Sequence, residues 1–165
     1  MIFCHICVEV GQDDEAADGS LICQRHEDRI WSLLNEVAQS FAFISDPDYL
    51  VASREPSSDY TKGRPPCNLN PIALTDRRSR YTRPGDPVSA YRVLWAWRNA
   101  AGDSMSGDWR QQFDGQTVGV LVAELKSAMP WLVKQPAIAR FARHVACVAD
   151  SLRRELPKEK ESDDH

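Results

Sequence analysis

The sequence lacks any long apolar stretch, because its longest apolar runs span only a few residues. About 20 consecutive apolar residues are needed for a helix to cross a bilayer, so we expect no membrane association. The first residues, MIFCHIC, also lack the basic residues and the long apolar core of a secretory signal peptide. We therefore expect a cytoplasmic protein. In a reducing cytoplasm, closely spaced cysteines bind metal more often than they form disulfides.

Catalytic motifs are absent as well. The sequence contains no Gly-rich phosphate loop, no GxSxG nucleophile elbow and no HExxH pair. Among its four histidines, only His144 lies both outside the cysteine-rich segment and away from the C-terminal end. We expect His144 to be a packing or surface residue at the edge of an apolar helix face. These absences predict a protein that is not an enzyme and that has no small-molecule substrate.

The composition is that of a globular protein, with 42% hydrophobic and 27% charged residues. The net charge of −4 is spread unevenly along the chain. Residues 1–53 hold two basic and ten acidic side chains, residues 54–92 hold eight and four, and residues 93–165 hold ten of each. Electrostatic attraction in salt acts over about 10 Å, so local charge decides which segment attracts phosphates. Only the middle segment has the excess of positive charge that a polyanion requires.

Two pairs of metal-binding residues stand near the start of the sequence. Cys4 and Cys7 form a Cys-x2-Cys pair, and 15 residues later Cys23 and His26 form a Cys-x2-His pair. Two such pairs, joined by a segment long enough to fold back, are the pattern of a structural zinc site with four ligands. His5 is a rival ligand, but it lies inside the first pair, where we expect its side chain to point away from the ion.

The periodicity of apolar residues divides the chain into four parts. Residues 1–45 are predicted to form a zinc hairpin followed by a first helix, whose apolar side chains recur every three or four positions. The hairpin arms are expected at residues 2–3 and 21–22. Further predictions are a Pro- and Arg-rich connection at 46–86, a helical region at 87–156 that packs on the first helix, and a disordered tail at 157–165.

Within the helical region, turn and capping signals set the expected helix ends. Asp86-Pro87 is a favourable start and Gly102 a favourable end for the first of these helices. The next is expected from Thr117 to about residue 128. A long helix that begins near Gln135-Pro136 and ends near Leu156 is expected to bury Cys147 as a small apolar group.

Four arginines form a basic run in the connecting segment, at Arg77, Arg78, Arg80 and Arg83. Arginine binds phosphate oxygens well, and Tyr81 within the run could stack on a base, so the run is a candidate nucleic-acid contact. The alternative is a solvated loop that balances the acidic N-terminal part.

Three other side chains have open roles. Cys67 has no nearby partner and is expected to be a free thiol. Trp95 and Trp97 point to different sides of their helix. Either one of them is an exposed contact for a partner protein, or the helix is covered on both faces.

Several segments resemble an uncharacterised family of actinobacteriophage and actinobacterial proteins. The segments CHIC and LICQRHEDRIWSLLNEV are similar to the zinc-knuckle unit and first helix of that family. Gly63–Pro66 with Asn70-Pro71 resembles its linker, Leu94–Trp97 its "LxxWAR" helix, and Val118–Leu156 its helical pair. His26 stands where a cysteine is usual. Longer members carry a second zinc ribbon and a C-terminal helix-turn-helix, and this sequence contains neither. The resemblance implies a phage or bacterial protein with a bound zinc ion.

Taken together, the patterns predict a mostly α-helical protein. It is expected to be a bundle of about four helices with an N-terminal, treble-clef-like zinc hairpin. The predicted function is that of a small, zinc-stabilised, non-enzymatic regulatory or adaptor protein that binds a host or phage protein. The alternative function is nucleic-acid binding through the basic run.

Overall fold

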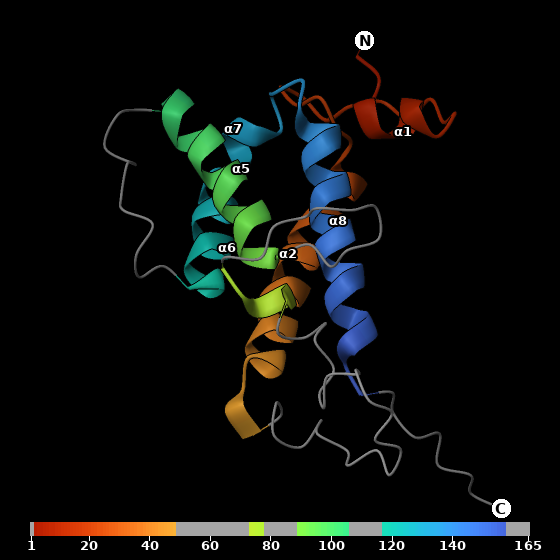
Figure 1. The fold of residues 1–165 in the computed structure, drawn as a ribbon. Coiled ribbons are helices and arrows are strands. Elements are labelled where there is room, and N and C mark those ends of the chain that lie inside the picture. Colours follow the sequence, from red (N-terminus) through yellow and green to blue (C-terminus); the bar gives the residue numbers. More distant parts are fainter. Residues whose placement is uncertain (1, 49–72, 78–88, 106–116, 158–165) are drawn as a thin grey trace, which may run out of the picture.

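The computed structural model describes residues 2–48, 73–77, 89–105 and 117–157 (Figure 1). These residues form helices and, among them, no strand: one isolated antiparallel bridge joins Phe3 and Glu15. The prediction of a mostly helical fold is confirmed. The labelled helices are α1 (His5–Glu9), α2 (Gln24–Ile44), α5 (Ala90–Met105), α6 (Val118–Ser127), α7 (Met129–Leu132) and α8 (Ile138–Glu155).

Helices α2 and α8 lie side by side and form the largest helix contact of the fold (Figure 1). They run in the same direction, because Leu21 before α2 contacts Val133 before α8, and Glu36 contacts Arg153 further along. Each helix buries one apolar stripe, with side chains at steps of three, four or seven residues that face the partner. The buried side chains of the two stripes are Ile30, Leu34, Val37 and Ile44 of α2, and Phe141, Val145, Val148 and Leu152 of α8.

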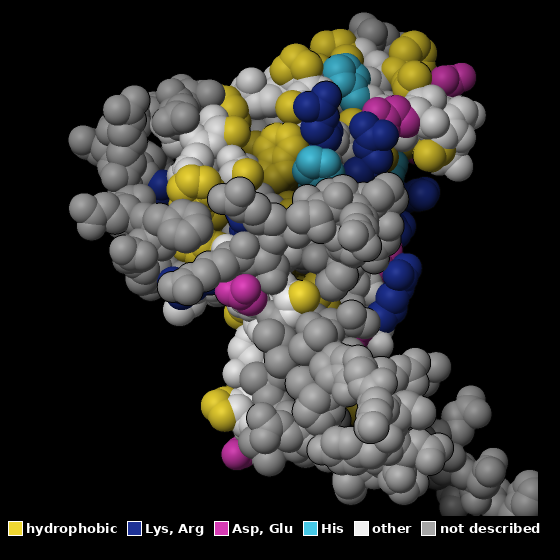
Figure 2. Space-filling view, viewed as in Figure 1, with side chains coloured by type: hydrophobic (Ala, Val, Ile, Leu, Met, Phe, Trp, Pro, Cys, Tyr) yellow, Lys and Arg dark blue, Asp and Glu magenta, His cyan; other side chains and the backbone are white. Residues whose placement is uncertain are grey.

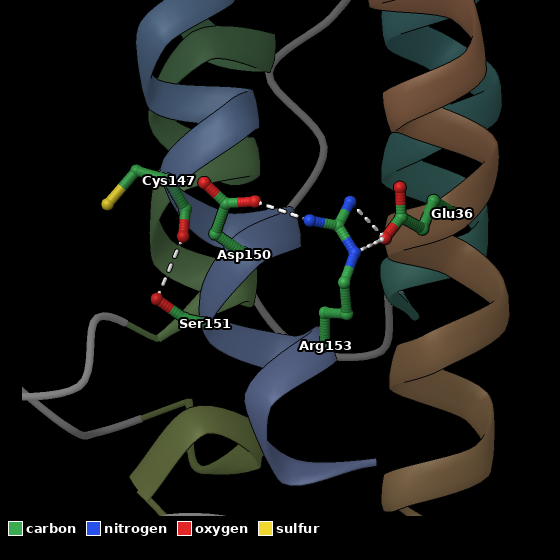
Figure 3. A network of polar contacts seen from close by, with 5 residues as sticks. All are labelled: Glu36, Cys147, Asp150, Ser151 and Arg153. Carbon is green, nitrogen blue, oxygen red and sulfur yellow. Dashed lines mark hydrogen bonds and ion pairs between the residues drawn. The ribbon is translucent and has the colours of Figure 1, made fainter. Parts of the chain in front are cut away.

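An ion pair at the surface joins the middle of α2 to the C-terminal end of α8 (Figure 3). The guanidinium of Arg153 lies 2.6 Å from Oε1 of Glu36 on α2 and 2.6 Å from Oδ1 of Asp150 on α8. Figure 3 also shows Cys147 pointing away from α2. The prediction that Cys147 is buried is therefore wrong, since its thiol is exposed. At about 100° per residue, position 147 lies well off the stripe that Val145 and Val148 define.

Helices α5 and α6 complete the bundle and run opposite to α2 and α8 (Figure 1). Arg98 of α5 is 3% exposed, and its Nε donates to Oε2 of Glu124 on α6 at 2.9 Å. The expected helix end at Gly102 is wrong, because α5 continues to Met105. Gly102 is buried, and packing there outweighs the roughly 1 kcal/mol by which glycine disfavours a helix.

Local signals set the start of α6 as predicted. Thr117 is its N-cap, and the threonine hydroxyl accepts a hydrogen bond from the backbone N–H of Val120 at 3.3 Å. Helix α8 begins at Ile138, two residues after Pro136, and ends at Glu155. The expected helix start at Asp86-Pro87 lies outside the described residues.

The connecting segment contains some regular structure where it is described. Residues 73–75 form a helical turn, and Leu74 within it is 1% exposed. One part of the connection therefore contributes to the core, although its sequence shows no sustained period. Residues 49–72 and 78–86 of the connection and the tail at 158–165 lie outside the described residues.

Candidate metal centre

The first pair of candidate ligands begins a short helix. Cys4 is the N-cap of α1 and has extended backbone angles, and Cys7 lies in the helix three residues later. The backbone N–H of Val8 donates to the carbonyl of Cys4 at 3.0 Å, which closes the first helical turn. Because residues three apart on a helix share a face, both sulfurs point to the same side.

The second pair repeats this arrangement at the start of α2. Cys23 is the N-cap, again with extended backbone angles, and His26 lies in the first turn. The carbonyl of Cys23 accepts from the N–H groups of His26 at 3.0 Å and Glu27 at 3.1 Å. Each Cys-x2-ligand pair therefore consists of an N-cap and a residue one turn later, and a metal ion held between the pairs would join the beginnings of two helices.

The four side chains meet at one point. Nδ1 of His26 lies 3.5 Å from Sγ of Cys4, 3.4 Å from Sγ of Cys7 and 3.3 Å from Sγ of Cys23. The sulfurs of Cys7 and Cys23 are 3.9 Å apart, and all four ligand atoms lie within 4.8 Å of one another. The three cysteines are free thiols rather than disulfides. This cluster can hold a metal ion, with Nδ1 as the histidine ligand atom.

The segment between the pairs folds back by a different route from the expected hairpin. Gly11 follows α1 with a φ of +74°, and the N–H of Gln12 donates to the carbonyl of Cys7 at 2.9 Å. This is a glycine-ended helix cap, which requires the left-handed backbone that glycine adopts without strain. The chain then pairs residues 14–16 with residues 2–4, through hydrogen bonds of 2.8 and 2.9 Å. The return arm of the hairpin is thus 14–16, whereas 21–22 was expected.

Residues 20–22 attach residues 2–26, here called the metal unit, to the bundle, and within this unit the carbonyl of Leu21 accepts from the N–H of His5 at 2.9 Å. The N–H of Leu21 donates to the carbonyl of Val133 at 2.7 Å, and the hydroxyl of Ser20 donates to the same oxygen at 3.4 Å. Ile22 is fully buried in the core. The second ligand pair starts directly after this contact, so the bundle fixes its position.

Burial changes the acidity of the ligands. Burial raises the pKa of the Cys7 thiol to about 12, helped by the neighbouring Cys4 and Asp14. Burial also acts on Cys4, but hydrogen bonds from the backbone N–H groups of Cys7 and Cys23 outweigh it and lower its pKa. The pKa of His26 is lowered by burial and then by Arg25 and Arg29, so the imidazole is kept in the neutral form that binds metal.

Asp14 is a neighbour of the site that the sequence patterns did not reveal. Its Oδ2 accepts a hydrogen bond from Sγ of Cys7 at 3.3 Å, and its backbone carbonyl accepts from the N–H of Cys4 at 2.8 Å. A carboxylate next to a metal-bound thiolate is electrostatically unfavourable. The acidic loop around Asp14 was visible in the sequence, but its place beside Cys7 depends on the glycine cap that turns the chain.

The other candidate residues are not part of this cluster. His5, the rival ligand, is not among the grouped ligands, as expected. Arg77 lies on the bundle, with its guanidinium 4.8 Å from the centroid of the Tyr91 ring. Arg78, Arg80 and Arg83, together with Cys67, lie outside the described residues.

Comparison with known proteins identifies no relative of this chain. No family model, curated protein or solved structure gives a significant match. The resemblance to the actinobacteriophage and actinobacterial family therefore stays a prediction. Within the described part of the chain, no helix combines the length and apolar character needed to cross a membrane.

Proposed function

We propose that the cluster binds a structural zinc ion. A tetrahedral zinc ion with Zn–S bonds of about 2.3 Å and Zn–N bonds of about 2.0 Å places its sulfurs about 3.8 Å apart and a sulfur and nitrogen about 3.5 Å apart. The Cys7–Cys23 sulfur separation is 3.9 Å, and the three S–N separations are 3.3–3.5 Å. Thiolate and imidazole ligands also suit zinc better than calcium or magnesium, which prefer oxygen.

A zinc ion held this way has a structural role. Four protein ligands fill every position of the tetrahedron, so no position is left for a water or a substrate to be activated. Cys4 and Cys7 are also fully buried. This argument supports the proposal that the chain is not an enzyme and that the ion organises residues 2–26.

We further propose that the metal unit displays a surface for another protein, as a regulatory or adaptor protein of phage or bacterial host would. The supporting observation is a set of large apolar side chains that stay exposed on a unit otherwise held by metal. Ile2, Phe3, Val8 and Val10 are 58, 46, 52 and 66% exposed. Isolated exposed apolar residues are ordinary, but four on one small unit favour a protein contact.

Charge indicates the kind of partner. Residues 2–48 carry ten acidic and two basic side chains, and Asp13, Glu15 and Asp18 are exposed on the unit that bears the apolar side chains. A partner with a basic rim around an apolar surface is complementary to this arrangement.

The test is a pull-down from bacterial lysate with wild-type protein and two surface variants. Phe3→Ser with Val8→Ser removes exposed apolar area without touching a ligand, and Val120→Ser removes a comparable side chain, 44% exposed, from α6. We expect a partner that wild type and Val120→Ser retain and the double variant loses. Equal retention by all three would reject the surface. A salt-dependent gel shift with single-stranded and duplex DNA tests the nucleic-acid alternative.

A further inference from the structure

A second surface lies between α5 and α8, next to the N-terminal unit but separate from its ligand cluster. It is an open groove of about 390 Å³, within the range of about 300–1,000 Å³ that is usual for ligand sites. Its floor is apolar, formed by Val93, Ala96 and the Trp97 ring. Figure 2 shows hydrophobic, basic and histidine side chains next to one another on this face of the molecule.

The two walls of the groove carry positive charge. Arg92 comes from α5 and Arg140 from α8, and none of the described residues that line the groove is acidic. Both guanidiniums are exposed, and neither forms an ion pair in the part of the chain that the structure describes. Unpaired arginines on both sides of an apolar floor favour a ligand that carries carboxylates around an apolar group.

The Trp97 ring in the floor of the groove is held in a fixed position by its neighbours without a bound ligand. Trp97 packs edge-on against Phe141, with ring centroids 5.2 Å apart and an interplanar angle of 68°. Its indole N–H donates to Nδ1 of His144 at 3.1 Å. That bond requires an unprotonated Nδ1, so the proton of a neutral His144 is on Nε2. A tryptophan that is already fixed loses little conformational entropy on binding, and tryptophan is enriched among the residues that contribute most to binding at protein interfaces.

From the chemistry of this groove we propose that it binds a short acidic segment of another protein, with one apolar side chain over Trp97 and flanking carboxylates on Arg92 and Arg140. The lining positions from 92 to 100 span about 12 Å of α5 at about 1.5 Å per residue. That length accommodates three or four extended residues at about 3.3 Å each. The proposal is independent of the metal unit, whose acidic surface favours a basic partner.

A nucleic acid fits this surface less well. Two unpaired arginines give few phosphate contacts, and non-specific binding of nucleic acid depends on many. The neighbouring N-terminal unit is acidic, and Glu9 of that unit lies 3.5 Å from Arg143 on the same helix as Arg140. A long polyanion would meet this negative charge, whereas a short peptide would not extend to it.

The experiment follows the indole N–H signal of Trp97 by ¹H–¹⁵N NMR in the full-length, zinc-loaded protein. Trp97→Phe identifies the signal and serves only for assignment. The probes are a blocked peptide with phenylalanine between pairs of glutamates, the same peptide with glutamines, and the same peptide with alanine in place of phenylalanine. We expect the first peptide to shift the signal with about tenfold higher affinity than the glutamine peptide, since each of two ion pairs at the rim contributes up to about fivefold. We expect it also to bind more tightly than the alanine peptide, which loses the apolar contact with Trp97.

Arginine variants test which side chains recognise the peptide. Arg92→Gln with Arg140→Gln is expected to weaken binding about tenfold, and Arg154→Gln, at an exposed position outside the groove, is expected to leave it unchanged. Unaltered melting temperatures would show that the variants fold. The proposal is overturned if no peptide shifts the signal at millimolar concentration, if the glutamine peptide binds equally well, or if a 12-nucleotide single strand binds more tightly than the acidic peptide.

Discussion

Replacement of Cys23 by serine is the sharpest test of the metal centre. Cys23 contributes both the sulfur 3.3 Å from Nδ1 of His26 and the N-cap of α2. Serine preserves the capping ability, since its hydroxyl is a good N-cap group, but it is a poor zinc ligand. Cys147→Ser is the matched control, because Cys147 is an exposed thiol on α8. The two variants make the same chemical change, and only one of them affects the cluster.

The size of the effect follows from linkage between metal binding and folding. A ligand that binds only the folded state at about 100 times its dissociation constant stabilises it by about 2.7 kcal/mol. For a chain of 165 residues, each kcal/mol moves the melting temperature by about 2–4 °C. We therefore expect Cys23→Ser to melt at least about 5–10 °C below wild type in zinc-containing buffer, and a chelator to lower wild type to a similar temperature. Cys147→Ser should match wild type in both buffers.

Amide hydrogen exchange shows which part of the structure is destabilised when the metal is removed. The N–H groups of Cys4, Ala16 and Ala17 donate to backbone carbonyls inside the metal unit. They should lose protection on chelation, whereas the amides of α2 beyond its first turn and of α8 should keep it, because those helices have their own apolar core. Equal melting temperatures for wild type and Cys23→Ser, or unchanged protection at Cys4 after chelation, would refute the metal centre.

Three further outcomes follow from other contacts. Asp14→Asn removes a carboxylate 3.3 Å from Sγ of Cys7, so zinc should be retained up to about fivefold better against a competing chelator; weaker retention would contradict this. Glu124→Ala removes the ion-pair partner of buried Arg98 and should lower the free energy of unfolding by about 2 kcal/mol in urea, since the buried charge loses a partner. The pKa of His144 is lowered by burial and then by Arg140 and Arg143. As the pH falls, the imidazole therefore becomes protonated in the unfolded chain before it does in the folded protein, and the free energy of unfolding decreases below about pH 6.5. His144→Gln should reduce the decrease in melting temperature between pH 7.5 and pH 5. An unchanged decrease would exclude His144 as its source.

Sequence patterns predicted the features that depend on neighbours within a few residues. The spacing Cys-x2-Cys and Cys-x2-His was sufficient to select all four members of the cluster. The steps between Ile30, Leu34 and Val37 were sufficient to place α2, and Thr117 marked the start of α6. In each case the signal itself, a ligand pair, an apolar stripe or a cap, lies within one or two helical turns; only the meeting of the two ligand pairs spans a longer separation.

What was missed depends on contacts between distant residues or on elements too short to show a period. Helix α1 has five residues, which is too few for a repeating apolar pattern. Gly102 looked like a helix end because glycine has a low helix propensity. Its burial, however, depends on the residues that pack around it, and these are not visible in the local sequence. Cys147 looked apolar by residue type, and only its angular position on α8 shows that it faces solvent.

The order in which contacts form during synthesis follows from where the ligands lie in the chain. Cys4 and His26 are 22 residues apart, whereas Glu36 and Arg153 are separated by 117. The proposed zinc ion would therefore close its site while most of the polypeptide is still to be synthesised, before α6 and α8 exist to cover the apolar side of α2. Bound at the first turn of α2, that ion would remove part of the unfavourable nucleation of the helix during this interval.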